Sequence, residues 1–412
     1  MNLEVDKHRL MSEIEALALI SDAEAPAVTR IVFTPTDLRA RAWFLARCEA
    51  AGLATRQDAI GNIFARWNGQ NPDLAAVATG SHIDAIPNAG KYDGVVGVLG
   101  GLEAIRALRQ SAFTPKRSIE LILFTSEEPT RFGIGCLGSR LLSGSLSADA
   151  AKKLTDKDGA SIEQVRRAAG FQGELETVKL PAGHFEAFVE LHIEQGPLLE
   201  QEKISLGIVS KIAAPASFRI FIEGAGGHAG GVLMPARRDA LCAASELILA
   251  IEHEAKSTGS TDTVATVGIC EVFPGAVNSI PSRVQLSVDI RDTDLHRRDS
   301  LITAVDASCQ AIAAKRQVNI NKELVNADAP GDCAANIVEA LSESCRKHRL
   351  PFITMVSRAY HDSLFMSRIT RVGMLFIPCR NGYSHRPDEY AAPDDIARGT
   401  LVLAETLRSL AG

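Results

Sequence analysis

Residues 75–125 have the sequence AAVATGSHIDAIPNAGKYDGVVGVLGGLEAIRALRQSAFTPKRSIELILFT and contain a strand-helix-strand pattern. The apolar runs AAVATGSHID (75–84) and IELILFT (119–125) predict buried strands, and GVVGVLGGLEAIRALRQS (94–111) has the apolar spacing of a helix. A third apolar run, AFVELHIE (187–194), predicts another buried strand. This alternation predicts an α/β domain in which helices cover a mostly parallel sheet.

The pattern changes near residue 213. The order becomes strand, helix, strand, strand, helix, strand, which is the ferredoxin-like order of an α+β domain. We expect a helix opened by Pro235 within this segment, because proline is favoured in the first helical turn. The alternation of strands and helices then resumes. The sequence therefore predicts a first domain over 1–213 and 327–412, with a second domain inserted over 214–326. The segments that carry the inserted pattern are SFRIFIEG (217–224), PARRDALCAASELILAIEHEA (235–255), TVATVGICEVFP (263–274), RVQLSVDIRD (283–292), DLHRRDSLITAVDASCQAIAAKR (294–316) and VNINKELV (318–325).

Composition excludes several classes of protein. The 412 residues are 46% hydrophobic and 23% charged, and no apolar run reaches the roughly 18 residues that a membrane span needs. The formal net charge is −6 without a basic stripe, so nucleic-acid binding is not expected. The eight cysteines are scattered and form no CxxC pair, a pattern typical of reduced thiols in a cytoplasmic protein.

Polar residues cluster where the predicted strands end, the edge at which open α/β sheets bind ligands. Each one alone has an ordinary explanation: a lone histidine is usually a core residue, a lone aspartate often caps a helix, and adjacent glutamates usually face solvent. Their convergence on one sheet edge favours a shared site. The residues are His82, Asp84, Asp93, Glu127, Glu128, His192 and His385.

Imidazole and carboxylate groups without cysteine suit divalent ions such as zinc or manganese. Five of these residues could hold two ions bridged by a carboxylate, and such a pair activates water near neutral pH. One of the two adjacent glutamates could then bind metal while the other accepts a proton. Asp84 is expected to orient His82 through the second ring nitrogen.

The inserted domain contributes three further candidates. GAGGHAGG (224–231) places His228 in a glycine-rich loop, where a solvent-exposed histidine is the simpler interpretation. Asn278 lies in PGAVNSIPSR (274–283), and Arg291 lies near the end of the strand 283–292. Arginine suits a substrate carboxylate because its fork binds in a bidentate manner, although a surface ion pair with Asp289 or Asp292 would also explain it.

The chain resembles the dinuclear-metal amidohydrolases related to aminoacylases and zinc exopeptidases, and within them the carbamoylase and ureide branch. The resemblance covers nearly the whole chain and implies two divalent ions per subunit, manganese being expected and zinc the alternative. It implies Glu127 as the general base, His82, Asp93, Glu128, His192 and His385 as ligands, Asp93 as the bridge, and a cis peptide between Asp93 and Gly94. The implied substrate-binding positions are Gln195, His228, Asn278 and Arg291. The inserted domain would form a homodimer and act as a lid, with His228 reaching into the neighbouring subunit's site and stabilising the oxyanion.

Several segments resemble the ureidoglycolate-hydrolysing members most closely: GKYDGVVGVLGGLEAI (90–105), FTSEEPTRFGIGCLGSRLL (124–142), SRAYHDSLFMSRI (357–369) and PCRNGYSHRPDEY (378–390). Other members typically have glycine in place of Pro129 and SGAGHD in place of SRAYHD. Tyr360 and His361 are therefore expected at the substrate. The resemblance implies hydrolysis of the ureido C–N bond of (S)-ureidoglycolate to glyoxylate, ammonia and carbon dioxide. An N-carbamoyl-L-amino acid or allantoate substrate is the alternative; a peptidase or a non-catalytic metal-binding protein fits the residues less well.

Overall fold

The computed structural model describes residues 3–412, and these form two compact units. The first unit contains the chain up to Ser210 together with Asp332–Ser357 and His361–Gly412, and the inserted unit contains Lys211–Gly331 and Arg358–Tyr360. In this part of the chain, no helix has the length and apolar character needed to cross a membrane.

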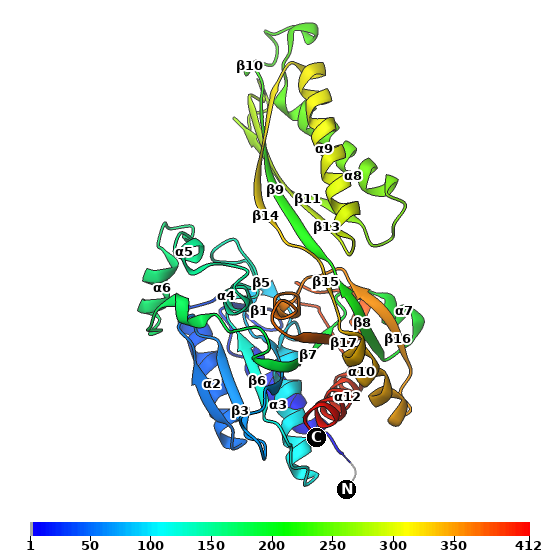
Figure 1. Ribbon diagram of the computed structural model, residues 1–412. Coiled ribbons are helices and arrows are strands. Elements are labelled where there is room, and N and C mark those ends of the chain that lie inside the picture. The colour runs from blue at the N-terminus through cyan, green and yellow to red at the C-terminus, as the bar shows by residue number, and fades with distance from the viewer. Residues whose placement is uncertain (1–2) are drawn as a thin grey trace. The chain divides into compact units, whose positions relative to one another are not determined.

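The first unit is built on a mixed sheet of nine strands in the order β15-β8-β17-β7-β4-β6-β3-β2, with β16 paired to β8 (Figure 1). Its four central strands, β17, β7, β4 and β6, are mutually parallel, whereas β8, β3 and β2 pair antiparallel. The predicted α/β sheet is therefore parallel at its centre and antiparallel towards the edges. Its strands are β2 (Ala54–Gln57), β3 (Ile63–Trp67), β4 (Ala76–His82), β6 (Ile119–Phe124), β7 (Phe185–Ile193), β8 (Leu206–Ile212), β15 (Gly331–Asp332), β16 (Phe352–Ser357) and β17 (Arg371–Ile377).

Helices cover this sheet and share its core. Every residue of β4 and β6 is buried, as expected for parallel strands covered on both faces. The remaining elements of the first unit are β1 (Val28–Arg30), β5 (Ala85–Ala89), α1 (Lys7–Ala18), α2 (Pro35–Ala50), α3 (Val95–Gln110), α4 (Leu137–Ser143), α5 (Ala148–Ala151), α6 (Ile162–Ala168), α7 (Leu198–Glu202), α10 (Ala335–Lys347), α11 (Asp362–Met366), α12 (Pro393–Ala411) and the 3-10 turns η1 (Leu175–Val178) and η3 (Arg380–Gly382).

The inserted unit has the predicted ferredoxin-like element order. Its four-stranded antiparallel sheet has the order β11-β13-β9-β14. Burial alternates along β13, and its buried residues join those of α8 and α9 in one core. The bounds are β9 (Ala214–Glu223), β10 (Gly227–His228), η2 (Met234–Ala236), α8 (Ala240–Ser257), β11 (Val264–Phe273), β12 (Ser279–Ile280), β13 (Arg283–Asp292), α9 (Leu295–Arg316) and β14 (Asn319–Ala327).

One local expectation for the inserted unit was wrong. Pro235 lies in the separate turn η2, and α8 begins at Ala240 because the side chain of Asp239 accepts hydrogen bonds from two backbone amides of its first turn. The segment Arg358–Tyr360 groups with the inserted unit, although the sequence assigned it to the first domain. Within that unit, Arg358 Nη2 donates to Asp262 Oδ1 at 2.8 Å.

Candidate active site

The parallel strands bring the predicted ligands of the first unit to one edge of the sheet. His82 is the last residue of β4 and lies level with Phe124, the last residue of β6. His192 lies near the end of β7, level with Phe376 of β17. The carboxyl ends of the four strands therefore meet, and the loops that leave them carry the other candidates.

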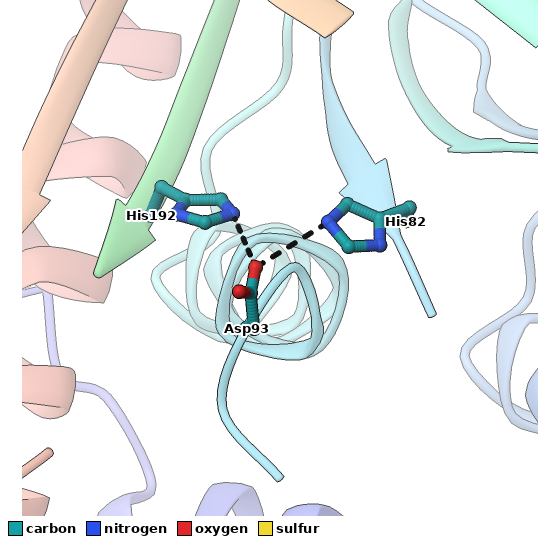
Figure 2. Close-up of side chains that lie close together, drawn as sticks. All are labelled: His82, Asp93 and His192. Atoms are coloured by element: carbon teal, nitrogen blue, oxygen red, sulfur yellow. Dashed lines mark ion pairs between the residues drawn. The ribbon is translucent and has the colours of Figure 1, made fainter. Parts of the chain in front are cut away.

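Asp93 lies between the two strand-end histidines. Figure 2 shows both imidazoles directed at the same carboxylate oxygen, Oδ1, which is 3.5 Å from His82 Nε2 and 3.2 Å from His192 Nε2. These three residues form a group whose ligand atoms lie close enough to share one ion. The site is buried, since none of the three side chains is more than 8% exposed.

A second group of possible ligands lies at the other oxygen of Asp93. His385 Nε2 is 3.3 Å from Asp93 Oδ2 and 3.1 Å from Glu128 Oε1. Asp93, Glu128 and His385 could also share one ion. The two groups have only Asp93 in common, one oxygen in each. This donor set of imidazoles and carboxylates fits a pair of divalent ions with Asp93 between them.

A bend after β6 places Glu127 and Glu128 in this pocket. Ser126 has a φ of 56°, a left-handed conformation that turns the chain at the end of the strand. The backbone amides of Glu127 and Glu128 then donate to the carboxylate of Asp84, at 3.2 and 3.0 Å. Asp84 thus fixes the backbone of the glutamate pair.

The expected role of Asp84 towards His82 needs correction. His82 Nδ1 lies 3.0 Å from the backbone carbonyl of Asp84 and 3.8 Å from its carboxylate. The carbonyl, not the side chain, therefore orients the imidazole, because the carboxylate already accepts the two amides of the glutamate pair.

Charge balance in the pocket shifts the pKa of its groups. Burial acts to raise the pKa of Asp93, but hydrogen bonds from His192, His385 and His82 hold it well below its usual range. Hydrogen bonds to Asp93 and Glu128 raise the pKa of His385 to about 11. The carboxylates of Asp93 and Glu128 thus favour positive charge in this pocket. Divalent ions would supply positive charge at the same place.

Glu127 belongs to neither ligand group. Its Oε2 is 3.7 Å from His82 Nε2, and its Oε1 accepts a hydrogen bond from the thiol of Cys136 at 3.4 Å. Burial and the nearby charge of Glu128 raise the pKa of Glu127 well above its usual range. A carboxyl group of this kind, close to the ligands but outside both groups, is a candidate for proton transfer.

The segment around Asp93 differs from expectation in one respect. The cis peptide bonds within residues 3–412 are Ala25–Pro26 and Phe273–Pro274, so the cis bond expected at Asp93–Gly94 is wrong. Gly94 instead has a φ of 66° and caps α3, and a Cβ atom there would lie 2.5 Å from the His82 ring. Glycine is therefore needed at residue 94. The Asp93 side chain does not cap α3 and instead contacts His82 and His192.

Two polar side chains hold the outer oxygen of Asp93, and a third holds its backbone. Gln195 Nε2 donates to Oδ2 at 2.7 Å, and Ser384 Oγ donates to it at 2.6 Å. Glu389 accepts the backbone amides of Tyr92 and Asp93. Sequence reasoning missed Ser384 and Glu389; their only signal was their proximity to His385 in NGYSHRPDEY (381–390).

His361 lies beside the ligand cluster, with its ring centroid 4.4 Å from that of His192. It is 2% exposed, and its Nε2 lies 3.2 Å from Ser357 Oγ. Glu190 joins both histidines in a third group of possible ligands, but its carboxylate accepts hydrogen bonds from Ser81 and Ser363.

The remaining candidates lie at opposite ends of the inserted unit. His228 is exposed on β10, and the backbone carbonyl of Asn278 accepts a hydrogen bond from the neighbouring Ala229 amide at 2.9 Å. Arg291 is at the far end of β13, where its Nε donates to Asp289 Oδ1 at 2.6 Å and its guanidinium lies 5.5 Å from the Tyr360 ring centre. The ion pair with Asp289 considered above is therefore present.

The length of β13 separates these two groups. The start of this strand at Arg283 pairs with Glu223, which leads into the loop of His228, and Arg291 pairs with Pro215. Eight residues of extended strand span about 26 Å. Arg291 and Asn278 of one chain therefore cannot hold the same small carboxylate.

Comparison with known proteins agrees with this architecture. Residues 78–409 match the model of peptidase family M20/M25/M40. The chain is 51% identical to ureidoglycolate hydrolase of Arabidopsis thaliana over 99% of this chain and 87% of that protein. It is 36% identical to an N-carbamoyl-L-amino-acid amidohydrolase of Pseudomonas over 98% of each chain. The crystal structure of AtUAH in complex with glyoxylate has a TM-score of 0.93 and 50% identity, covering 99% of this chain and 98% of that one.

Close identity over the full length, together with the shared fold, gives one assignment. The chain belongs to peptidase family M20/M25/M40, in the amidohydrolase branch that includes ureidoglycolate hydrolases and carbamoylases.

Proposed function

We propose that this enzyme hydrolyses the ureido C–N bond of (S)-ureidoglycolate and that the products are glyoxylate, ammonia and carbon dioxide. The main support within the molecule is the position of Asp93, which has one oxygen in each of two ligand groups, with a non-ligand glutamate beside them. The choice of substrate is supported by the relatives named above, which hydrolyse ureidoglycolate or bind glyoxylate.

Two divalent ions, which we propose to be manganese, would polarise the ureido carbonyl and lower the pKa of the attacking water. His82 and His192 would hold one ion, Glu128 and His385 the other, and Asp93 would hold both. Zinc accepts the same ligands, and metal analysis of the purified protein distinguishes the two.

Glu127 supplies the proton transfers in this proposal. It accepts the proton of the attacking water and then donates it to the leaving nitrogen, first as general base and then as general acid. Its position beside His82, outside both ligand groups, leaves its carboxylate available for this role.

Substrate recognition would require two copies of the chain. Arg291, whose guanidinium lies near the Tyr360 ring, would bind the substrate carboxylate in a bidentate manner. His228 and Asn278 lie beyond the other end of β13, a strand that spans about 26 Å from Arg283 to Arg291. We therefore propose that they enter the site from a second copy, where His228 stabilises the oxyanion. Gln195 and His361 would complete the site from the first unit.

The edge of the inserted sheet offers a surface for that second copy. Within residues 3–412, β11 pairs on one side only, with β13. It also exposes apolar side chains, Ile269 at 52% and Phe273 at 39%. We therefore propose a homodimer formed through the inserted unit, because an unpaired apolar edge strand is otherwise a site of aggregation.

The free cysteines support a reducing compartment. All eight are unpaired in the structure, and we propose the cytoplasm as the location.

A comparison of substrates tests the proposed activity. The manganese-loaded protein is assayed for ammonia release from (S)-ureidoglycolate, allantoate and an N-carbamoyl-L-amino acid at matched concentrations. We expect ureidoglycolate to have the highest kcat/KM. A higher value for either of the other substrates would show that the chain has the alternative carbamoylase or allantoate activity.

A further inference from the structure

Glu389 is a buried carboxylate at the candidate site that the mechanism above does not use. Glu389 is 4% exposed and lies in the loop that follows β17. One oxygen, Oε1, accepts the backbone amides of Tyr92 and Asp93, at 2.8 and 3.1 Å. The other, Oε2, lies 2.9 Å from Ser384 Oγ. Glu389 thus connects the His385 loop to the segment that carries Asp93.

Ser384 extends this connection to the Asp93 carboxylate. Its hydroxyl lies between two acceptors, Glu389 Oε2 at 2.9 Å and Asp93 Oδ2 at 2.6 Å. Glu389 therefore contacts the backbone of Asp93 directly and its side chain through one hydroxyl. Both the position and the rotation of the Asp93 carboxylate depend on these contacts.

Residue 90 is a glycine, and the Glu389 side chain occupies the space that a side chain at residue 90 would need. A Cβ atom on Gly90 would lie 2.3 Å from Glu389 Cβ and 2.4 Å from its Oε1. Real Cβ atoms do not approach other heavy atoms this closely, so any larger residue at 90 would displace the Glu389 side chain. Glu389 and Gly90 together shape the turn that leads to Asp93.

We infer that Glu389 is a positioning residue that keeps Asp93 directed at both ligand groups at once. The inference rests on the proposed dinuclear function, because only a bridging carboxylate must satisfy two groups simultaneously. A rotation of Asp93 would keep contact with one group and lose the other. Removing a residue that hydrogen-bonds a metal ligand typically lowers metal affinity by about 10-fold to 100-fold.

Binding of Mn²⁺ measures this role without reference to activity. The metal-depleted protein is titrated with Mn²⁺, and the electron paramagnetic resonance signal of the free ion gives the number of sites and their Kd values. We expect Glu389→Ala to weaken binding of the second Mn²⁺ by about 10-fold to 100-fold. Glu389→Gln should bind within about 3-fold of wild type, because Gln keeps the Oε1 acceptor and its amide can donate to Ser384.

Two further variants test the same contacts independently. Gly90→Ala should weaken the second Mn²⁺ as Glu389→Ala does, and Ser384→Ala should weaken it less because the backbone contacts remain. Glu103→Ala is the matched control. Glu103 is a fully buried glutamate that accepts the backbone amide of Asp6, and it should leave Mn²⁺ binding unchanged.

The outcomes separate this inference from the proposed function. Wild-type protein that binds fewer than two Mn²⁺ ions would overturn both. Wild-type protein that binds two ions and hydrolyses ureidoglycolate, with Glu389→Ala and Gly90→Ala binding equally well, would overturn the inference alone. Equal losses in Glu389→Gln and Glu389→Ala would also overturn it, since they would indicate a need for negative charge instead of positioning.

Discussion

Glu127 and Glu128 are adjacent carboxylates that face different partners. Glu128 Oε1 is 3.1 Å from His385, while Glu127 Oε2 is 3.7 Å from His82. The left-handed Ser126 and the two hydrogen bonds to Asp84 produce this divergence. One bend in the backbone thus places a possible metal ligand and a possible proton acceptor side by side.

Replacing Glu127 separates these two roles. We expect Glu127→Gln to bind metal as wild type does, because Glu127 belongs to neither ligand group. Its kcat should fall by about 10²-fold to 10⁴-fold, because an amide cannot accept the proton. Steady-state kinetics with metal analysis measures both quantities. Glu120→Gln, a substitution of a buried glutamate in β6, is the control, and near-normal turnover of Glu127→Gln would contradict the assignment.

Asp362 should make stability depend on pH. Burial and the charge of Glu190 raise its pKa to about 8, from an unfolded value near 3.8, and its Oδ2 has no hydrogen-bond partner among the described residues. As pH rises from about 4 to about 8, the unfolded chain releases this proton while the folded chain retains it. Ionisation therefore favours the unfolded state, and the stability contributed by Asp362 is lost over this window.

Asp362→Asn removes that titration while preserving shape. In the metal-depleted protein, the free energy of unfolding of the variant relative to wild type should increase between pH 5 and pH 8. Urea unfolding at both pH values measures the difference. A difference that does not change with pH would contradict the raised pKa.

At the scale of elements, the contact between α3 and the sheet positions the site. A Cβ atom on Gly97 would lie 2.4 Å from the backbone carbonyl of Leu191 and 2.7 Å from Ser81 Cβ. Leu191 and Ser81 precede the strand-end residues His192 and His82. The close approach of α3 therefore determines where Asp93, just before this helix, meets the two histidines.

Gly97→Ala should disturb this contact. We expect it to lower the free energy of unfolding by about 1–3 kcal/mol, because a backbone carbonyl cannot move aside easily. Gly101→Ala in the same helix is the matched control, since a Cβ atom there would meet the ends of the Leu121 and Thr79 side chains. Urea unfolding compares the two variants, and an equal or smaller loss in Gly97→Ala would contradict the rigid contact.

The apolar periodicity of the sequence predicted which helices and strands form, and in what order, better than it predicted where they end and what they contact. The buried strands and the ferredoxin-like order could be predicted because buried elements need apolar residues, which appear as apolar runs in the sequence. The start of α8 was missed because Asp239 competes with Pro235 as a start signal, and both occur within a few residues. The convergence of His82, Asp93 and His192 could be predicted from strand ends, whereas the contacts of Glu389 depend on a turn 297 residues away in sequence.

At the scale of the whole molecule, the proposed dimer makes a specific prediction about mixed variants. His228→Ala and Arg291→Ala should each lose nearly all activity as purified homodimers. When the two are mixed and allowed to exchange subunits, half of the random pairs contain one site with both residues intact. We therefore expect recovery of up to roughly a quarter of wild-type activity.

Activity after subunit exchange is the measurement, and its concentration dependence should follow dimer formation. Two samples of His228→Ala mixed in the same way are the control and should stay inactive. Failure of the unlike pair to recover activity, although mixed dimers are present, would show that both residues serve the site of their own chain.

The most direct test of the account is turnover of ureidoglycolate as a function of bound metal. Metal-depleted protein receives increasing Mn²⁺, and glyoxylate formation is measured at each ratio of metal to chain. Two ligand groups that share Asp93 predict no turnover without metal and full turnover at two ions per chain. Full turnover without metal, or saturation at one ion per chain, would contradict the dinuclear site.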